Sequence, residues 1–159
     1  MKSDKKLSLW ERYLTTEIGI EFKACLYFFA ILFFYCMYRM ICGVFNASIL
    51  HMAEMIFTCY IIGYLQVYLF WNFDEAETLG VKEIAGMVIC TFIYGLISRL
   101  CNWFDGKLTV TLILAAYILI TYLCVFLIYK TKRSIDDRKL NEELRLFQAE
   151  HKKVKDSGK

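Results

Sequence analysis

The chain has 159 residues, of which 58% are hydrophobic and 17% aromatic, and it contains no proline; its mean hydropathy is +0.45. A soluble globular domain is typically about 45–50% apolar. The composition therefore excludes disordered and collagen-like proteins and indicates a protein that is solvated by lipid. The net charge of +3 averages over unlike parts, because five of the 19 Lys and Arg precede residue 24 and ten lie at or after Lys130.

Four long apolar stretches occupy the weakly charged centre of the chain. A helix of about 20 residues rises about 30 Å, which is the thickness of the hydrocarbon layer of a membrane. Backbone groups in lipid must be hydrogen-bonded within the segment, so these stretches predict helices. Short links make consecutive helices antiparallel neighbours. We expect an all-α integral membrane protein, an up-down four-helix bundle with spans over about 19–44, 49–71, 84–104 and 108–129.

The two ends of the chain are polar and basic. Residues 1–18 form a basic N-terminal segment, and residues 130–159 read as a charged helix that extends the fourth predicted span. Lys and Arg are enriched on the cytoplasmic side of membrane proteins. We therefore expect a multi-pass protein of the cell's inner (plasma) membrane with both termini in the cytoplasm.

The sequence carries no recognisable catalytic motif. The seven cysteines show no CxxC spacing, and His51 and Glu54 alone do not make a metal site. We therefore expect no enzymatic activity, no catalytic residues, no metal and no cofactor.

Four polar residues inside the predicted spans form one candidate cluster: Arg39, His51, Glu54 and Arg99. Counted along their helices, Arg39, Glu54 and Arg99 lie at a similar depth, roughly 7 Å below the outer surface. Charges facing lipid are costly, so Glu54 is expected to pair with Arg39, Arg99 or both, with His51 nearby. The cluster is interpreted as a structural ion pair, as an outward-facing pocket for an anionic or peptide signal, or as a transport site centred on Glu54.

The C-terminal tail has one apolar stripe. Leu140, Leu144 and Phe147 are spaced i, i+4, i+7, as on one face of a helix. Two interpretations stay open. The helix packs on its own bundle or on the lipid surface, or the stripe binds a partner protein.

The chain resembles a known group in three short segments: FDE at 73–75, WFD at 103–105, and the tail YKTKRSIDDRKLNEELRLFQ. Together with four helices and basic ends, these are similar to small bacterial four-helix membrane proteins of an uncharacterised-domain family, over about residues 20–150. Such proteins partner LytTR-family DNA-binding transcription regulators. The resemblance implies a membrane protein that sequesters and inhibits its cognate regulator.

The predicted function is therefore regulation through protein–protein interaction, without direct binding of nucleic acid by this chain. An acidic link offers charge complementarity to a basic DNA-binding surface. Self-association of the chain is left open. The alternative functions are a small transporter or channel subunit that uses Glu54, and a structural assembly partner of another membrane protein. The residues expected to contact the regulator are Asp74, Glu75, Glu77, Glu83, Ile135, Leu140, Leu144 and Phe147.

Overall fold

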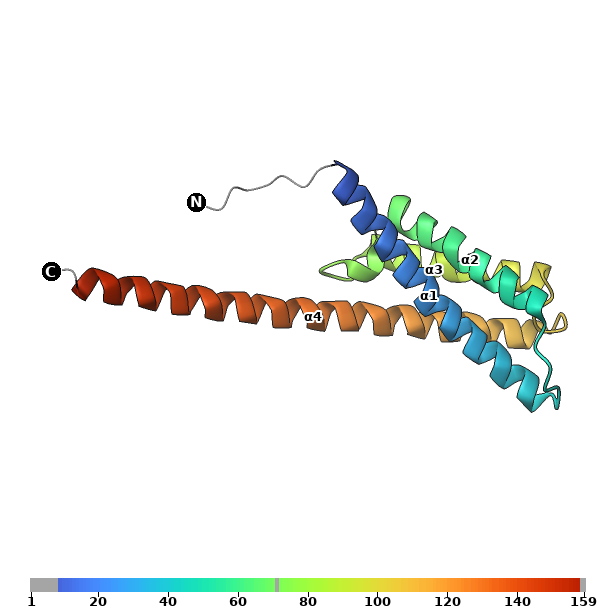
Figure 1. Ribbon diagram of the computed structural model, residues 1–159. Helices are drawn as coiled ribbons and strands as arrows, with labels where there is room; N and C mark the ends of the chain where they lie inside the picture. Colours follow the sequence, from blue (N-terminus) through green and yellow to red (C-terminus); the bar gives the residue numbers. More distant parts are fainter. Residues whose placement is uncertain (1–8, 71, 158–159) are drawn as a thin grey trace.

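The computed structural model describes residues 9–70 and 72–157, and within them the chain is all-helical, without strands. Four α-helices and one short 3-10 turn make up the fold (Figure 1). They are α1 (Leu9–Ile41), α2 (Ile49–Tyr68), η1 (Phe73–Glu75), α3 (Val81–Leu100) and α4 (Leu108–Ser157). The all-α fold class and the four apolar helices expected from the sequence are confirmed.

All four α-helices have the length and composition to cross a membrane. The candidate spans are Tyr13–Ile41, Ile49–Tyr68, Val81–Leu100 and the apolar part of Leu108–Gln148. Large apolar side chains also cover the outside of the helices, for example Phe29, Phe57 and Phe92, which are each 65–69% exposed. Such an exterior suits contact with lipid tails rather than water.

Some helix boundaries differ from the expected ones. Helix α1 begins at Leu9 instead of near residue 19, because hydropathy marks the part of a helix that suits lipid and misses its polar first turns. Helix α3 ends at Leu100 rather than near residue 104. Asn102 and Asp105 there adopt left-handed backbone conformations, with φ of 58° and 53°, which a continuing helix does not allow.

The connections lie at two ends of the molecule. Figure 1 places the α1–α2 and α3–α4 connections at one end of the helices and the α2–α3 link at the other. The hydroxyl of Tyr38 near the end of α1 donates a hydrogen bond to Asp105 in the α3–α4 connection, at 3.1 Å, which agrees with that view. Helix α1 packs mainly on α2, and α3 packs mainly on α4.

The core between the helices is rich in aromatic side chains. Tyr27 contacts Tyr122 with ring centroids 4.7 Å apart, and Phe73 meets Tyr122 edge-on at 5.1 Å. The residues that α1 buries recur every three or four positions, as expected for a helix with one buried stripe. The buried residues of that stripe are Ile20, Lys23, Ala24, Tyr27, Ile31, Tyr35 and Tyr38.

Helix α4 is 50 residues long and continues well beyond the other helices (Figure 1). At 1.5 Å per residue, such a helix is about 75 Å long. Every residue from 134 to 148 is exposed, so this part of the helix does not pack on the bundle. The tail is thus a helix that continues the fourth span, as expected. Packing of the tail on its own bundle, which is one part of the first open interpretation, is not observed over residues 134–148.

Candidate functional site

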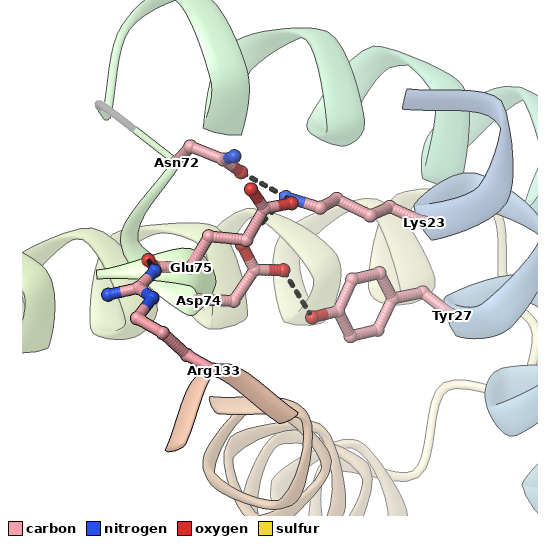
Figure 2. A network of polar contacts seen from close by, with 6 residues as sticks. All are labelled: Lys23, Tyr27, Asn72, Asp74, Glu75 and Arg133. Carbon is pink, nitrogen blue, oxygen red and sulfur yellow. Dashed lines mark hydrogen bonds and ion pairs between the residues drawn. The ribbon is translucent and has the colours of Figure 1, made fainter. Parts of the chain in front are cut away.

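A lysine is buried in the middle of a polar network at the end of the bundle from which α4 extends. Lys23 lies on the inward stripe of α1, and its side chain is only 1% exposed. Its Nζ atom lies 2.8 Å from Asp74 Oδ1 and 2.9 Å from Glu75 Oε1, and it also donates to Asn72 Oδ1 (Figure 2). A lysine ammonium has three donors, and here each one has an oxygen partner.

The α2–α3 link presents these oxygens because of its backbone conformation. Asn72 has a φ of 56°, and the turn of η1 that follows directs Asp74 inward, where its side chain is 0% exposed. The hydroxyl of Tyr27 donates to Asp74 Oδ2 at 3.3 Å. Gly86 of α3 admits the neighbouring ring of Phe73, since a Cβ at this position would lie 2.8 Å from Phe73 Cδ1.

Arg133 connects the network to α4, at the point where that helix leaves the bundle. Its Nη2 atom donates to the carbonyl oxygen of Glu75 at 2.6 Å, and its Nη1 atom lies 3.7 Å from Glu77 Oε1. Lys23 Nζ also lies 5.8 Å from the centre of the Tyr129 ring on α4. These contacts join α1, the link and α4 into one unit. We call it the Lys23 network; its members are Lys23, Tyr27, Asn72, Asp74, Glu75 and Arg133 (Figure 2).

A cleft leads from the surface of the protein to the Lys23 network on one side. A cleft of about 260 Å³ is lined by residues from α1, the end of α2 and the link: Thr15, Thr16, Gly19, Lys23, Val67, Asn72 and Glu75. The side chain of Glu75 is 39% exposed, whereas those of Lys23 and Asp74 are closed off. Glu75 therefore stands between the buried ion pair and the solvent.

A second polar cluster lies toward the opposite end of the bundle. Glu54 Oε2 accepts a hydrogen bond from Trp103 Nε1 at 3.0 Å and lies 3.0 Å from His51 Nδ1. The side chains of His51 and Glu54 are 24% and 28% exposed. Burial, and to a smaller extent the charge of Glu54, raises the pKa of the Cys101 thiol nearby. The Glu54 side chain in this cluster therefore has an indole and an imidazole within hydrogen-bond distance.

The expected pairing of Glu54 with Arg39 or Arg99 is wrong. Arg39 donates to the carbonyl of Asn46 at 3.4 Å and lies 4.0 Å from Asp105, while Arg99 donates to the carbonyl of Gly106 at 3.4 Å. Both arginines stand in the last turn of their helices. Carbonyl groups there lack helical partners, and the long side chains reach the adjoining loops. Of the predicted cluster, the structure brings only His51 and Glu54 together.

The predicted partner surface divides into a buried part and an exposed part. Asp74 is fully buried and bound to Lys23, so its assignment to a contact surface is wrong; Glu75 is largely engaged in the same network. Glu77 remains 85% exposed beside Arg133, and Glu83 is half-buried in the first turn of α3. The four predicted residues of the tail are all exposed: Ile135 by 48%, Leu140 by 58%, Leu144 by 49% and Phe147 by 59%.

Sequence reasoning missed five of the residues that make up the two polar clusters: Lys23, Tyr27, Asn72, Trp103 and Arg133. A signal for Lys23 was present, because it follows Ile20 by three residues and precedes Tyr27 by four, on the inward stripe of α1. Trp103 had no such signal, since its partner Glu54 lies 49 residues away in the sequence. Among the described residues, no group of three or more His, Cys, Asp or Glu could hold a metal ion.

The chain matches no protein-family model, and neither a curated protein nor a solved structure is significantly similar to it.

Proposed function

We propose that this protein is a membrane anchor that binds and inhibits a DNA-binding transcription regulator of the LytTR type. In this proposal, the four helices cross the inner membrane up and down, and both termini lie in the cytoplasm. The basic ends of the chain support that orientation, because ten of its 19 Lys and Arg lie at or after Lys130. The resemblance of the tail to the partners of LytTR regulators supports the identity of the captured protein.

The exposed extension of α4 is the observation that carries the proposal. Leu140, Leu144 and Phe147 form an apolar stripe on a helix whose residues from 134 to 148 are exposed. An amphipathic helix that lays such a stripe in the groove of a partner is a recurrent mode of recognition. Ile135 lies on another face, because five residues turn a helix by about 500°.

The direction of α4 favours a protein partner over a lipid surface. The helix continues past the bundle along its own axis (Figure 1). Leu140 therefore lies about 16 Å, and Phe147 about 27 Å, beyond Tyr129, the last residue of the apolar part. A stripe at this distance from the hydrocarbon layer is available to a cytoplasmic protein.

The Lys23 network gives this binding surface a fixed base. Arg133 lies two turns before Leu140 and is bonded to the link through the carbonyl of Glu75. The link is in turn held to α1 by the buried pair of Lys23 and Asp74. A rearrangement of the bundle would thus reach the extension through these two polar contacts and the link between them, which suits a protein whose affinity for a regulator changes.

The test first asks whether a LytTR-type regulator is encoded beside this protein, and then whether that regulator co-purifies with the full-length protein from membranes. We expect the regulator to be found in the membrane fraction when this protein is present and in the soluble fraction when it is absent. Transcription from the regulator's own target promoter should rise when the membrane protein is removed. A regulator that stays soluble in both cases contradicts the proposal.

A further inference from the structure

Two hollows lie one beyond the other along α4. The first, which we call the apolar groove, has a volume of about 240 Å³ between α3 and α4, and all the residues that line it are apolar. The second, which we call the polar pocket, has a volume of about 400 Å³ where α4 leaves the bundle, and all the residues that line it are polar or charged. The helix residues of the apolar groove are Ile84, Met87 and Val88 of α3 and Leu119, Ile120 and Leu123 of α4.

The two hollows lie on the same side of α4. Leu123 lines the apolar groove, and Lys130 and Asp137 line the polar pocket. These three residues follow one another at intervals of seven, which is close to two helical turns, so they share one face. The α2–α3 link contributes to both hollows, because Leu79 lines the apolar groove and Glu77 lines the polar pocket.

The depth of each hollow matches one layer of a membrane. Tyr129 is the last residue of the apolar part of α4, and Leu123 and Leu119 lie about 9 Å and 15 Å before it along the helix. One leaflet of the hydrocarbon layer is about 15 Å thick, so the apolar groove lies within a leaflet. Lys130 and Arg133 lie about 1.5 Å and 6 Å beyond Tyr129, which is the depth of the phospholipid headgroups.

The polar pocket has a surplus of positive charge. Three basic side chains line it, Lys130, Arg133 and Arg138, beside the two carboxylates of Glu77 and Asp137. The surplus is one positive charge, which matches a phosphodiester with its single negative charge. Basic pockets at the ends of membrane-spanning helices are known to bind anionic headgroups. Carboxylates accept hydrogen bonds from hydroxyl groups, so a headgroup that carries hydroxyls beside its phosphate fits this pocket.

Lys130 and Arg138 are the two cations that a ligand can reach. Arg133 is engaged by the protein, because its guanidinium donates to the carbonyl of Glu75 at 2.6 Å and lies 3.7 Å from the carboxylate of Glu77. Within the part of the chain that the structure describes, no carboxylate forms an ion pair with Lys130 or Arg138, and both residues are exposed. Arginine and lysine side chains are the usual protein partners of phosphate oxygens.

We propose that an anionic glycerophospholipid of the phosphatidylglycerol type binds along this side of α4, with its phosphate in the polar pocket and an acyl chain in the apolar groove. Such a lipid has the charged and the apolar part that the two hollows require, at the depths where they lie. A zwitterionic phospholipid brings its own ammonium and leaves the surplus charge of the pocket unmatched. A second copy of the chain, related by a twofold axis, would bring its own basic pocket against this one. The lipid site does not depend on capture of a regulator by α4.

Lipid binding to the purified full-length protein tests the proposal. The protein, freed of lipid in a mild detergent, is titrated with dioleoyl phosphatidylglycerol, and bound lipid is counted by native mass spectrometry. We expect one lipid per chain and a melting temperature that rises with lipid concentration, because a ligand that binds only the folded state stabilises it. Dioleoyl phosphatidylethanolamine should bind at least about tenfold more weakly, and soluble glycerol phosphate should not bind at the same concentration.

Two double variants separate a built site from general attraction to a basic segment. Lys130→Gln combined with Arg138→Gln should weaken binding of phosphatidylglycerol by about thirtyfold, which follows from the contribution of each basic residue near an anionic membrane surface. Lys132→Gln combined with Lys139→Gln removes the same charge from another side of α4 and should bind the lipid like the wild type. All four positions are exposed, so both variants should unfold at the wild-type temperature without lipid.

Several results would overturn the lipid site. Absence of a phosphatidylglycerol adduct, equal binding of the two phospholipids, or an equal loss in the two double variants would each do so. Glycerol phosphate that binds as tightly as the lipid would show that the apolar groove is not used. A dimer of chains without bound lipid would assign the groove to a second copy. Co-purification of a regulator is measured separately, so the two proposals fail independently.

Discussion

Lys23 and Asp74 form a salt bridge of 2.8 Å although they are 51 residues apart, and their side chains are only 1% and 0% exposed. Removing two charges from water is expensive and is repaid only when both find good partners. Here Asn72, Glu75 and Tyr27 provide the remaining hydrogen bonds. The salt bridge fixes the α2–α3 link against α1. Removing one of the two charges should destabilise the protein more than removing both, because a single charge is left buried without its partner.

Replacement of Lys23 by methionine should therefore destabilise the protein strongly. The substitution leaves Asp74 charged, buried and without its main partner, for which the expected loss is about 3–5 kcal/mol. The measurement is thermal or denaturant unfolding of the purified protein in detergent. The double variant Lys23→Met, Asp74→Asn should regain much of the loss. A single variant as stable as the wild type would contradict the buried salt bridge.

Removal of the Arg133 side chain should lower the free energy of unfolding less than removal of Lys23 does. Arg133→Ala removes the guanidinium hydrogen bond to the carbonyl of Glu75, at 2.6 Å, and the half-exposed contact with Glu77. A hydrogen bond to a charged group contributes about 1.5–3 kcal/mol, whereas the exposed ion pair adds little. Unfolding measurements on Arg133→Ala should show a loss in this range. Lys132→Ala, at the exposed neighbouring position, is the control and should be neutral.

Removing the Trp103 donor to Glu54 should destabilise the protein more than removing Arg99 does. Trp103→Phe keeps a ring in the core but removes the indole donor to Glu54, so we expect a loss of about 1.5–3 kcal/mol. Arg99→Leu should cost less, because Arg99 is exposed and, within the described part of the chain, binds the carbonyl of Gly106 and no carboxylate. Unfolding of the two variants under the same conditions gives the comparison. A larger loss in Arg99→Leu would favour the ion pair with Glu54 that the sequence suggested.

The close approach of α3 to the link can be tested with glycine substitutions. A methyl group at Gly86 would meet the ring of Phe73 at 2.8 Å, and forcing extra atoms into a packed site costs about 1–3 kcal/mol. Gly95 lies on the same helix, but its added methyl would lie 3.8 Å from the nearest atom, Thr111 Cγ2. Gly86→Ala should therefore lower the melting temperature, while Gly95→Ala should leave it unchanged or raise it, because alanine favours helices. Equal behaviour of the two variants would show that Phe73 does not pack there.

The four helices could be predicted from the sequence because hydropathy reports directly on contact with lipid. The regions 49–71 and 108–129 agree with the starts of α2 and α4 at Ile49 and Leu108. Polar extensions of helices carry no such signal. The first turns of α1 from Leu9 were therefore assigned to a separate N-terminal segment.

The candidate site was harder to predict, for reasons that differ between its residues. Lys23 follows several other basic residues near the N-terminus, so its charge was counted with a solvated end of the chain. Asp74 lies in an acidic link, which suggested an exposed surface, and only the turn of η1 directs it inward. Counting residues from the ends of the predicted helices put Arg39 and Arg99 at the same depth in the membrane as Glu54. It could not show that both side chains reach toward the loops.

Capture of the regulator by wild-type protein and by variants of the α4 stripe tests the central claim most directly. Leu140→Lys combined with Leu144→Lys places two charges on the stripe, whereas Leu146→Lys places one on a different face, at a residue that is 65% exposed. All three positions lie outside the bundle, so the variants should unfold at the wild-type temperature. We predict that the double variant retains less than about a tenth of the regulator in the membrane fraction. The loss of two apolar contacts should cost more than about 1.4 kcal/mol of binding free energy, which corresponds to a tenfold loss of affinity. Leu146→Lys should retain it fully, and wild-type capture by the double variant would contradict the account.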